Sequence, residues 1–226
     1  MQVLENKIIV YDDVCPMCNA YTAGFVRLGW LKHRTGFADA PPELLQKIDL
    51  NRARHEIPLL DTQTGEVTYG VNALFLILGE QMPFFKPLFR NRLFRSAIYQ
   101  LYQLITYNRR VIAGSAAPKT GFDCAPDVNL FYRWLYIGLA ATGATLLFWQ
   151  DFSLDNLAIK VLLPLLGFSL AAVFFTNKKL DFVGHWATIA LTSALLISLL
   201  PQIIAVQVGI AALAAWMSWK RWQLLK

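Results

Sequence analysis

The last 100 residues of the chain carry few charges, and this constrains the fold more than any other feature. Residues 127–226 hold four acidic and seven basic side chains, in a chain of 226 residues that is 56% hydrophobic overall. A helix of about 20 apolar residues spans the hydrocarbon core of a membrane. Four stretches approach that length: 131–149, 157–176, 186–200 and 203–219. The sequence therefore predicts an all-α transmembrane four-helix region over residues 127–226.

The third and fourth stretches meet at Pro201-Gln202 and can be read in two ways. A single kinked helix across both would have about 34 residues and a length of about 50 Å, well beyond a bilayer. Two separate helices would each be short, but tryptophans flank them, and this residue anchors helices at the membrane interface. The flanking residues are Trp186, Trp216, Trp219 and Trp222. We therefore expect two helices joined by a tight turn.

The charges between these stretches predict how the region lies in the membrane. The first connection carries Asp151 and Asp155 and no basic residue, whereas the second carries Lys178 and Lys179. Basic connections stay on the cytoplasmic side. The N-terminus also lacks the basic and apolar regions of a signal peptide. We expect an integral protein of a bacterial inner membrane, with both termini and the N-terminal half in the cytoplasm.

Residues 83–126 are predicted to form a basic amphipathic helical segment that completes the N-terminal domain. Its first part, 83–110, has six basic side chains, no acid and seven interleaved aromatics. This part either lies on the anionic inner leaflet, which makes membrane lipid a partner, or is an ordinary domain helix with a solvated basic face. Residues 1–126 and 127–226 each carry a net charge of +3, and neither contains a nucleic-acid-binding motif. We therefore expect no nucleic-acid partner.

The motif Cys15-Pro16-Met17-Cys18 stands where an apolar, β-branched run ends and a helical pattern begins. Residues 7–12 predict a buried strand, and proline is favoured in the first turn of a helix. Cys15 should therefore lie at a helix N-terminus, where the dipole and unpaired N–H groups lower the pKa of a thiol. Cys18, one turn further on, should be more buried and close enough to form a disulfide with Cys15.

Two thiols at this spacing can be a redox pair, half of a metal site, or an inert pair. Tetrahedral zinc needs four ligands, and only Cys124 and three histidines at unrelated spacing could add to the two cysteines. A purely structural disulfide is rare in a reducing cytosol. We therefore interpret the pair as redox-active and expect neither a metal nor an organic cofactor.

The next part of the chain predicts a hairpin followed by a helix. Ile57-Pro58 opens an apolar strand, a glycine turn follows, and a second strand leads into an apolar helix. The expected elements after the first helix are strands 37–39, 57–61 and 67–69 and helices 42–54 and 73–78. This order predicts an α/β thioredoxin-like domain, in which a cis proline, here Pro58, would lie beside the cysteine pair.

Three parts of the chain resemble the DCC family of thiol-disulfide oxidoreductases, small thioredoxin-like proteins named for an Asp-x-x-Cys-x-x-Cys motif. They are "YDDVCPMC", "GEVTYGVNAL", and "LITYNRRVIAGS" with "FDCAP", all within residues 7–126. The resemblance implies a thioredoxin-like core over residues 1–82. Asp13 and Val14 stand where the family usually has other residues, glycine among them.

The resemblance also implies a role for each site residue. Cys15 would attack a disulfide as a thiolate, and Cys18 would resolve the mixed disulfide. Asp12 would transfer a proton or fix the loop, and Pro58 would shape the substrate groove. Cys124 would be either an accessory thiol or a buried small residue.

The function expected from these features is that of a membrane-anchored thiol-disulfide oxidoreductase, similar to a protein-disulfide reductase. Its partners would be a protein or small-molecule disulfide and a separate reductant. Two alternatives stay open: a non-catalytic binding module tethered to the membrane, and a transporter or electron conduit with a regulatory thioredoxin-like head. The second is disfavoured because Lys160 is the only ionisable residue well inside a predicted span.

Overall fold

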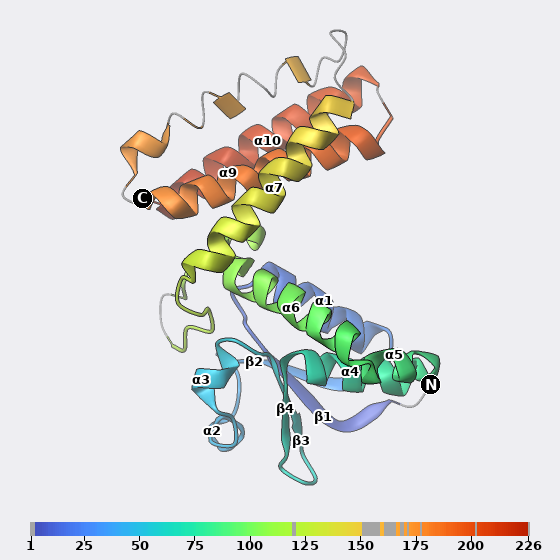
Figure 1. The fold of residues 1–226 in the computed structure, drawn as a ribbon. Helices are drawn as coiled ribbons and strands as arrows, with labels where there is room; N and C mark the ends of the chain where they lie inside the picture. Colours follow the sequence, from blue (N-terminus) through green and yellow to red (C-terminus); the bar gives the residue numbers. More distant parts are fainter. Residues whose placement is uncertain are drawn as a thin grey trace. The chain divides into compact units, whose positions relative to one another are not determined.

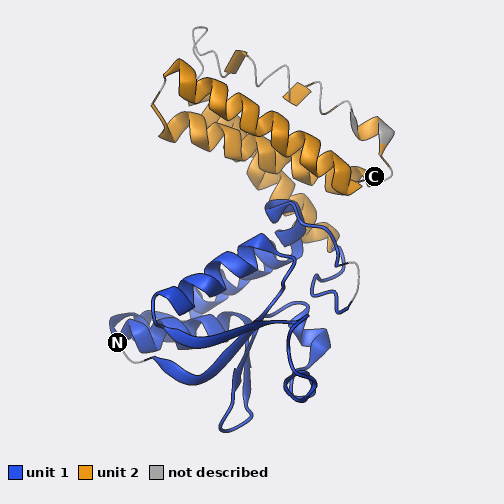
Figure 2. Ribbon diagram, turned by 180° about the vertical axis from the view of Figure 1, so that it is seen from behind, with its two compact units in different colours: residues 1–128 blue, residues 129–226 orange. Residues whose placement is uncertain are grey.

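The computed structural model describes residues 3–118, 121–150, 159–160, 166–167, 170, 172–176, 178–201 and 203–225. The chain divides into two compact units, residues 1–128 and 129–226, which Figure 2 shows in different colours. Each unit has its own hydrophobic core and is described by itself.

The first unit is built on a four-stranded mixed sheet (Figure 1). Its strands are β1 (Leu4–Tyr11), β2 (Leu31–Gly36), β3 (Pro58–Asp61) and β4 (Val67–Tyr69), in the order β2-β1-β3-β4. β1 and β2 are parallel because a helix connects them, whereas β3 pairs antiparallel with both β1 and β4. This is the predicted α/β thioredoxin-like arrangement, and the predicted β3–β4 hairpin is confirmed.

Helices cover both faces of this sheet. Neighbouring residues of a strand point to opposite faces, and Ile9 and Val10 of β1 are both fully buried. Ile9 packs with a cluster that includes Ile77 of helix α4 (Gly70–Gln81) and is flanked by Phe25 of helix α1 (Pro16–Arg27). Val10 belongs to a second cluster on the other face, with Phe37, Ala53 and Cys124 among its members. β1 is therefore buried on both faces, and the short loop after its C-terminal end leads to Cys15.

Helix α1 ends earlier than its apolar periodicity suggests, and this moves the second strand. Gly29 adopts a positive φ of 70°, its N–H donates to Val26 O, and the Trp30 N–H donates to Phe25 O. These bonds form a Schellman motif, which stops a helix. Leu31, which fits the helical spacing, instead begins β2. The strand predicted at 37–39 was therefore wrong.

The predicted helix over 42–54 is two short helices, α2 (Pro42–Leu45) and α3 (Leu50–Ala53). Asp49 lies between them in an extended conformation, and its carboxylate accepts the Arg52 N–H at 3.1 Å. An N-cap of this type starts a new helix and excludes a continuous one.

The basic segment forms a short 3-10 turn (Pro83–Phe85), helix α5 (Lys86–Arg90) and the long helix α6 (Arg92–Ala113). Asn91 caps α6 by accepting the Leu93 and Phe94 N–H groups. α6 contacts α1 and α4, and Figure 1 shows it beside α1. One face of α6 is therefore part of the core of the first unit.

The second unit contains three long helices among its described residues: α7 (Leu130–Gln150), α9 (Lys179–Leu199) and α10 (Ile204–Leu225). A 3-10 turn, Ala172–Phe175, precedes α9. α9 packs against both α7 and α10, with small residues such as Ala144, Ala190 and Ala214 in the contacts. The prediction of two helices at Pro201 is confirmed, because α9 ends before this proline and α10 begins after it.

The prediction of four membrane spans is not supported. In the described part of the chain only α9 is long and apolar enough to cross a membrane, with a mean hydropathy of 1.6, and 56% of that stretch is buried. The stretch 131–149 lies within α7, and 203–219 begins one residue before α10 and otherwise lies within it. Both helices contain polar residues, such as Arg133 and Gln207. Most of 157–176 lies outside the described residues.

Candidate active site

Cys15 is the N-cap of α1, as the helical pattern predicts. Its backbone is extended (φ −91°, ψ 108°), Pro16 follows as the first helical residue, and the Cys18 N–H donates to Cys15 Sγ at 3.4 Å. The thiol thus replaces the usual hydroxyl or carboxylate as acceptor for a free N–H at the helix start. The partial positive charge of the helix N-terminus therefore lies next to this sulfur and favours its thiolate form.

Both thiols are free and buried. Cys15 is 1% exposed and Cys18 is 5% exposed, so both side chains are almost completely enclosed. The Cys15 sulfur accepts the Cys18 N–H, and the Cys18 side chain lines a cavity on the inner side of α1.

The two thiols differ strongly in acidity. A hydrogen bond from the Cys18 thiol, opposed by burial and aided by the Cys18 N–H and by Arg109, lowers the pKa of Cys15 to about 6. The same hydrogen bond, together with burial, raises the pKa of Cys18 far above its usual range. This arrangement favours the thiolate at Cys15 and the protonated thiol at Cys18.

Asp12 follows β1 and faces an arginine from α6. Its carboxylate lies 3.2 Å from Arg109 Nη2, and the two side chains are only 8% and 11% exposed. The other carboxylate oxygen accepts the Val14 N–H at 3.2 Å and so fixes the loop that leads to Cys15. Burial raises the pKa of Asp12, and Arg109 opposes this effect.

Arg109 is the functional residue that the sequence analysis missed, because it was grouped with a basic face turned to lipid or solvent. Burial opposes its charge, but Cys18, Asp12 and the other acidic groups nearby outweigh burial and raise its pKa. The available signal was its spacing: Tyr102, Thr106 and Arg109 are four and three residues apart and share one face of α6. All three line the cavity beside the thiols.

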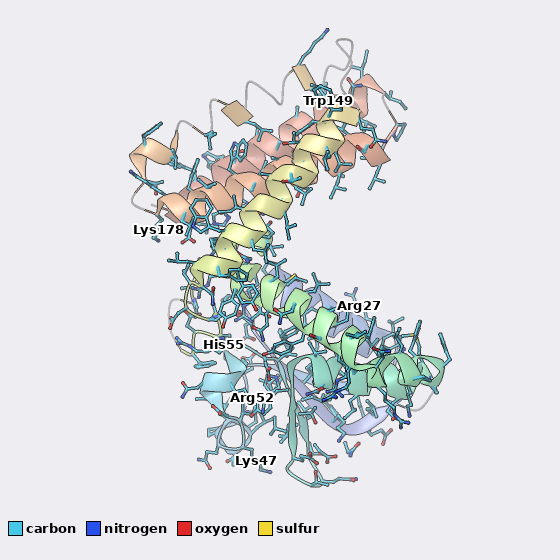
Figure 3. All side chains as sticks on the ribbon, in the orientation of Figure 1. Arg27, Lys47, Arg52, His55, Trp149 and Lys178 are labelled. Atoms are coloured by element: carbon cyan, nitrogen blue, oxygen red, sulfur yellow. The ribbon has the colours of Figure 1, made fainter. Side chains whose placement is uncertain are left out.

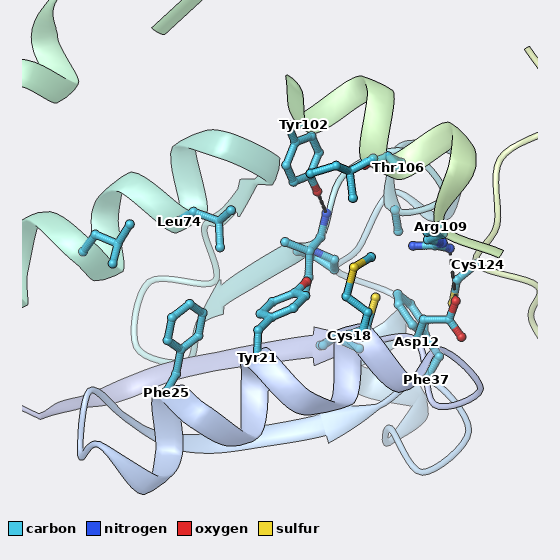
Figure 4. A pocket seen from close by; sticks show the side chains of 17 residues that line it. Asp12, Cys18, Tyr21, Phe25, Phe37, Leu74, Tyr102, Thr106, Arg109 and Cys124 are labelled. Atoms are coloured by element: carbon cyan, nitrogen blue, oxygen red, sulfur yellow. Dashed lines mark hydrogen bonds and ion pairs between the residues drawn. The ribbon is translucent and has the colours of Figure 1, made fainter. Parts of the chain in front are cut away.

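This cavity has a volume of about 360 Å³ and lies within the first unit. Figure 4 shows Cys18, Asp12 and Arg109 gathered at one end and Phe25 and Leu74 at the other. Tyr21 and Tyr102 lie between the two ends, and Tyr102 Oη accepts the Ile57 N–H at 2.9 Å. The charged side chains thus lie at the thiol end of the cavity, and apolar side chains line the opposite end.

Pro58 and Cys124 also line this cavity, so the structure brings all five predicted site residues into one region. The Ile57–Pro58 bond is trans, the isomer that X-Pro bonds intrinsically favour, and the cis prediction was wrong. Cys124 is buried, and burial raises the pKa of its thiol above the usual range. In the part of the chain that the structure describes, no three His, Cys, Asp or Glu side chains gather as metal ligands.

Residues 9–115 match the model of a family described as DCC1-like thiol-disulfide oxidoreductase. This part of the chain is a DCC1-like thiol-disulfide oxidoreductase domain. The match contains Asp12, Cys15, Cys18, Pro58 and Arg109 and ends before Cys124 and the second unit. No curated protein and no solved structure matches the chain at a significant level.

Proposed function

We propose that Cys15 and Cys18 carry out dithiol/disulfide exchange, with Cys15 as the attacking thiolate and Cys18 as the resolving thiol. The observation that carries this order is the position of Cys15 at the N-cap of α1, where its sulfur accepts the Cys18 N–H at 3.4 Å and its pKa is lowered to about 6 from the ordinary value of about 8.5. A thiolate is the nucleophile in thiol chemistry, and Cys15 holds it at neutral pH. Cys18 keeps its proton until the second step.

The exchange has two steps. The Cys15 thiolate attacks one sulfur of the substrate disulfide, which forms a mixed disulfide and releases the other sulfur as a thiolate. That thiolate takes the proton of Cys18, and the Cys18 sulfur then attacks the mixed disulfide. The second thiol leaves, and the two electrons of the pair have reduced the substrate. A separate dithiol reductant regenerates Cys15 and Cys18 from their disulfide.

The buried Asp12–Arg109 pair serves the same chemistry in this proposal. Arg109 favours every thiolate formed in the site, because its positive charge lowers the pKa of both Cys15 and Cys18. Asp12 compensates the buried guanidinium and holds the loop through Val14. Its raised pKa also suits a carboxyl group that relays the proton of Cys18. Pro58 lines the cavity and would shape the substrate groove.

Two single substitutions test the order of attack. Cys18→Ser leaves a nucleophile without a resolving thiol, so mixed disulfides should accumulate on Cys15 and be found there by mass spectrometry. Cys15→Ser should abolish exchange. If Cys15→Ser instead trapped mixed disulfides on Cys18, the order would be reversed, and if both variants kept full reductase activity, the proposed function would be wrong.

We propose further that the second unit anchors the protein in a membrane. α9 supports this by its length and hydropathy, and α7 and α10 carry many exposed large apolar side chains. Trp149, labelled at the end of α7 in Figure 3, is 82% exposed. A soluble protein rarely exposes apolar surface on this scale. Alkaline carbonate extraction of membranes tests the anchor: the full chain should stay in the pellet, and its release into the supernatant would refute it.

A further inference from the structure

We propose that the cavity beside the thiol pair binds one arm of a small, uncharged apolar disulfide, and that this class of molecule is the substrate rather than a disulfide on a folded protein. The inference rests on the proposed function and adds the chemistry of the substrate to it.

Access to the two sulfurs is the first reason. With Cys15 1% and Cys18 5% exposed, almost no part of either thiol reaches the molecular surface. The disulfide of a folded protein lies on a bulky surface and must dock against an exposed sulfur before in-line attack. A small molecule can instead enter the cavity, whose wall includes Cys18.

The character of the cavity is the second reason. A volume of about 360 Å³ falls in the range that holds small-molecule ligands. Among the described residues that line it, Asp12 and Arg109 are the only charged ones, and both lie at the thiol end. Phe25 and Leu74 line the cavity away from these charges. A charged substrate arm would lose its hydration along this wall without gaining a partner, whereas an apolar arm would gain from leaving water.

The third reason is the arrangement of the groups at the thiol end, which suits exchange with a disulfide bound in the cavity. The Cys18 N–H donates to Cys15 Sγ at 3.4 Å, so the Cys15 sulfur lies next to a residue of the cavity wall. In the proposed reaction the Cys18 side chain rotates about its Cα–Cβ bond and exposes Cys15 to the bound disulfide. Arg109 Nε is buried and has no hydrogen-bond partner among the described residues, so it is available to the thiolate that leaves.

The reaction follows from this placement. The Cys15 thiolate attacks the sulfur that bears the buried arm, and the other arm leaves as a thiolate beside Arg109. Cys18 transfers its proton to that thiolate, attacks the Cys15 sulfur of the mixed disulfide and releases the buried arm as a thiolate, which takes a proton from water. The products are two small thiols and the Cys15–Cys18 disulfide, which a dithiol reductant reduces again.

Single-turnover oxidation of the fully reduced full-length protein tests the inference. The probes are hydroxyethyl, hydroxybutyl and hydroxyhexyl disulfides, which differ only in the length of a neutral arm, with glutathione disulfide and insulin as charged and protein comparators. The measured quantity is the second-order rate constant for formation of the Cys15–Cys18 disulfide, mapped by mass spectrometry. Each buried methylene adds up to about fourfold, so the constant should rise at least about tenfold along the series.

A pair of matched variants locates the arm. Leu74→Trp fills the end of the cavity opposite the thiols and should reduce the hydroxyhexyl rate constant about tenfold, while the hydroxyethyl value changes least. Leu93→Trp makes the same change at a residue of α6 that is 83% exposed and is the control. The wild-type series needs no variant, so the inference stays testable if Leu74→Trp does not fold.

The outcomes separate the inference from the proposed function. A rate constant that does not depend on arm length, or one for insulin or glutathione disulfide that equals the hydroxyhexyl value, overturns the apolar substrate but leaves the exchange activity intact. Failure of every disulfide to oxidise the pair overturns both. A rise along the series that Leu74→Trp abolishes and Leu93→Trp preserves supports the cavity as the substrate site.

Discussion

Replacing Cys18 with alanine isolates the interaction that makes Cys15 acidic. The substitution removes the thiol that donates to Cys15, but it keeps the backbone N–H of residue 18 and the charge of Arg109. A hydrogen bond to a charged group contributes about 1.5–3 kcal/mol, and 1.36 kcal/mol corresponds to one pKa unit. The pKa of Cys15 should therefore rise by about 1–2, from about 6 to between about 7 and 8.

The assay is the pH dependence of Cys15 alkylation by iodoacetamide, followed on the Cys15 peptide by mass spectrometry. The midpoint of the profile is the informative quantity, because a thiolate with a higher pKa is also intrinsically more nucleophilic and partly hides the change in rate. At pH 7 the thiolate fraction should fall from about 90% to between about 10% and 50%. Cys18→Ser is the matched control, since its hydroxyl still donates and should hold the midpoint nearer to the wild-type value.

Two results would refute this reasoning. If the wild-type profile had its midpoint near 8.5, Cys15 would be an ordinary thiol and the helix cap would have no chemical consequence. If the wild-type and Cys18→Ala midpoints coincided near 6, the Cys18 thiol would not be the main cause, and the helix N-terminus and Arg109 would have to supply the effect.

Three further predictions follow from the site and the fold. Asp12→Asn removes a charge that raises the pKa of Cys15, so the midpoint of Cys15 alkylation should move to lower pH. Arg109→Met removes a charge that lowers this pKa, so the midpoint should move to higher pH. Movement of both midpoints in the same direction would contradict these assignments. Arg109→Met should also destabilise the domain by about 3–5 kcal/mol in denaturant unfolding, because it leaves a buried carboxyl group unpaired. The reduced protein should gain stability as the pH rises from about 6 to about 8.5, because unfolded Cys15 still binds a proton in this range and folded Cys15 does not. It should lose stability above about 8.5, where Cys18 ionises only in the unfolded chain, and a stability curve without this rise and fall would refute the two opposite pKa shifts. Gly70→Ala should lower the free energy of unfolding by about 1–2 kcal/mol, since Gly70 has a φ of 59° and an added Cβ would lie 3.0 Å from Glu56. Gly24→Ala, in open space within α1, should raise it by about 0.5–1 kcal/mol. Equal effects of the two substitutions would contradict the backbone argument.

The position of Cys15 could be predicted because its signals are local. A β-branched strand, a proline in the first turn and the following apolar spacing all lie within a few residues of the cysteine, and each acts through the backbone of that segment. The same method misplaced β2, where the decisive feature is a single glycine. Gly29 ends α1 by taking a left-handed conformation, and apolar spacing alone does not register such a stop.

Arg109 shows why the site as a whole could not be predicted. A count of charges along 83–110 treats its six basic residues alike, yet burial separates them: Arg109 faces Asp12, which precedes it by almost one hundred residues. The cost of burying a guanidinium is met only where a carboxylate and thiolates approach it from other elements. No periodicity within α6 contains that information, although its Tyr102–Thr106–Arg109 stripe marks the face that turns inward.

The substrate could not be predicted from the sequence for the same reason, because exposure of the thiols depends on the residues packed around them. The sequence places two cysteines one turn apart at a helix start, and this spacing is compatible with protein or small-molecule disulfides alike. What separates these substrates is the wall around the sulfurs, formed by residues from β1, β3, α1, α4, α6 and the segment that holds Cys124. Apolar residues at those positions predict a core and do not predict a gap within it, because a cavity is the space that the packed side chains fail to fill. The choice between substrates therefore depends on packing between elements far apart in the chain, and the arm-length series measures that packing directly.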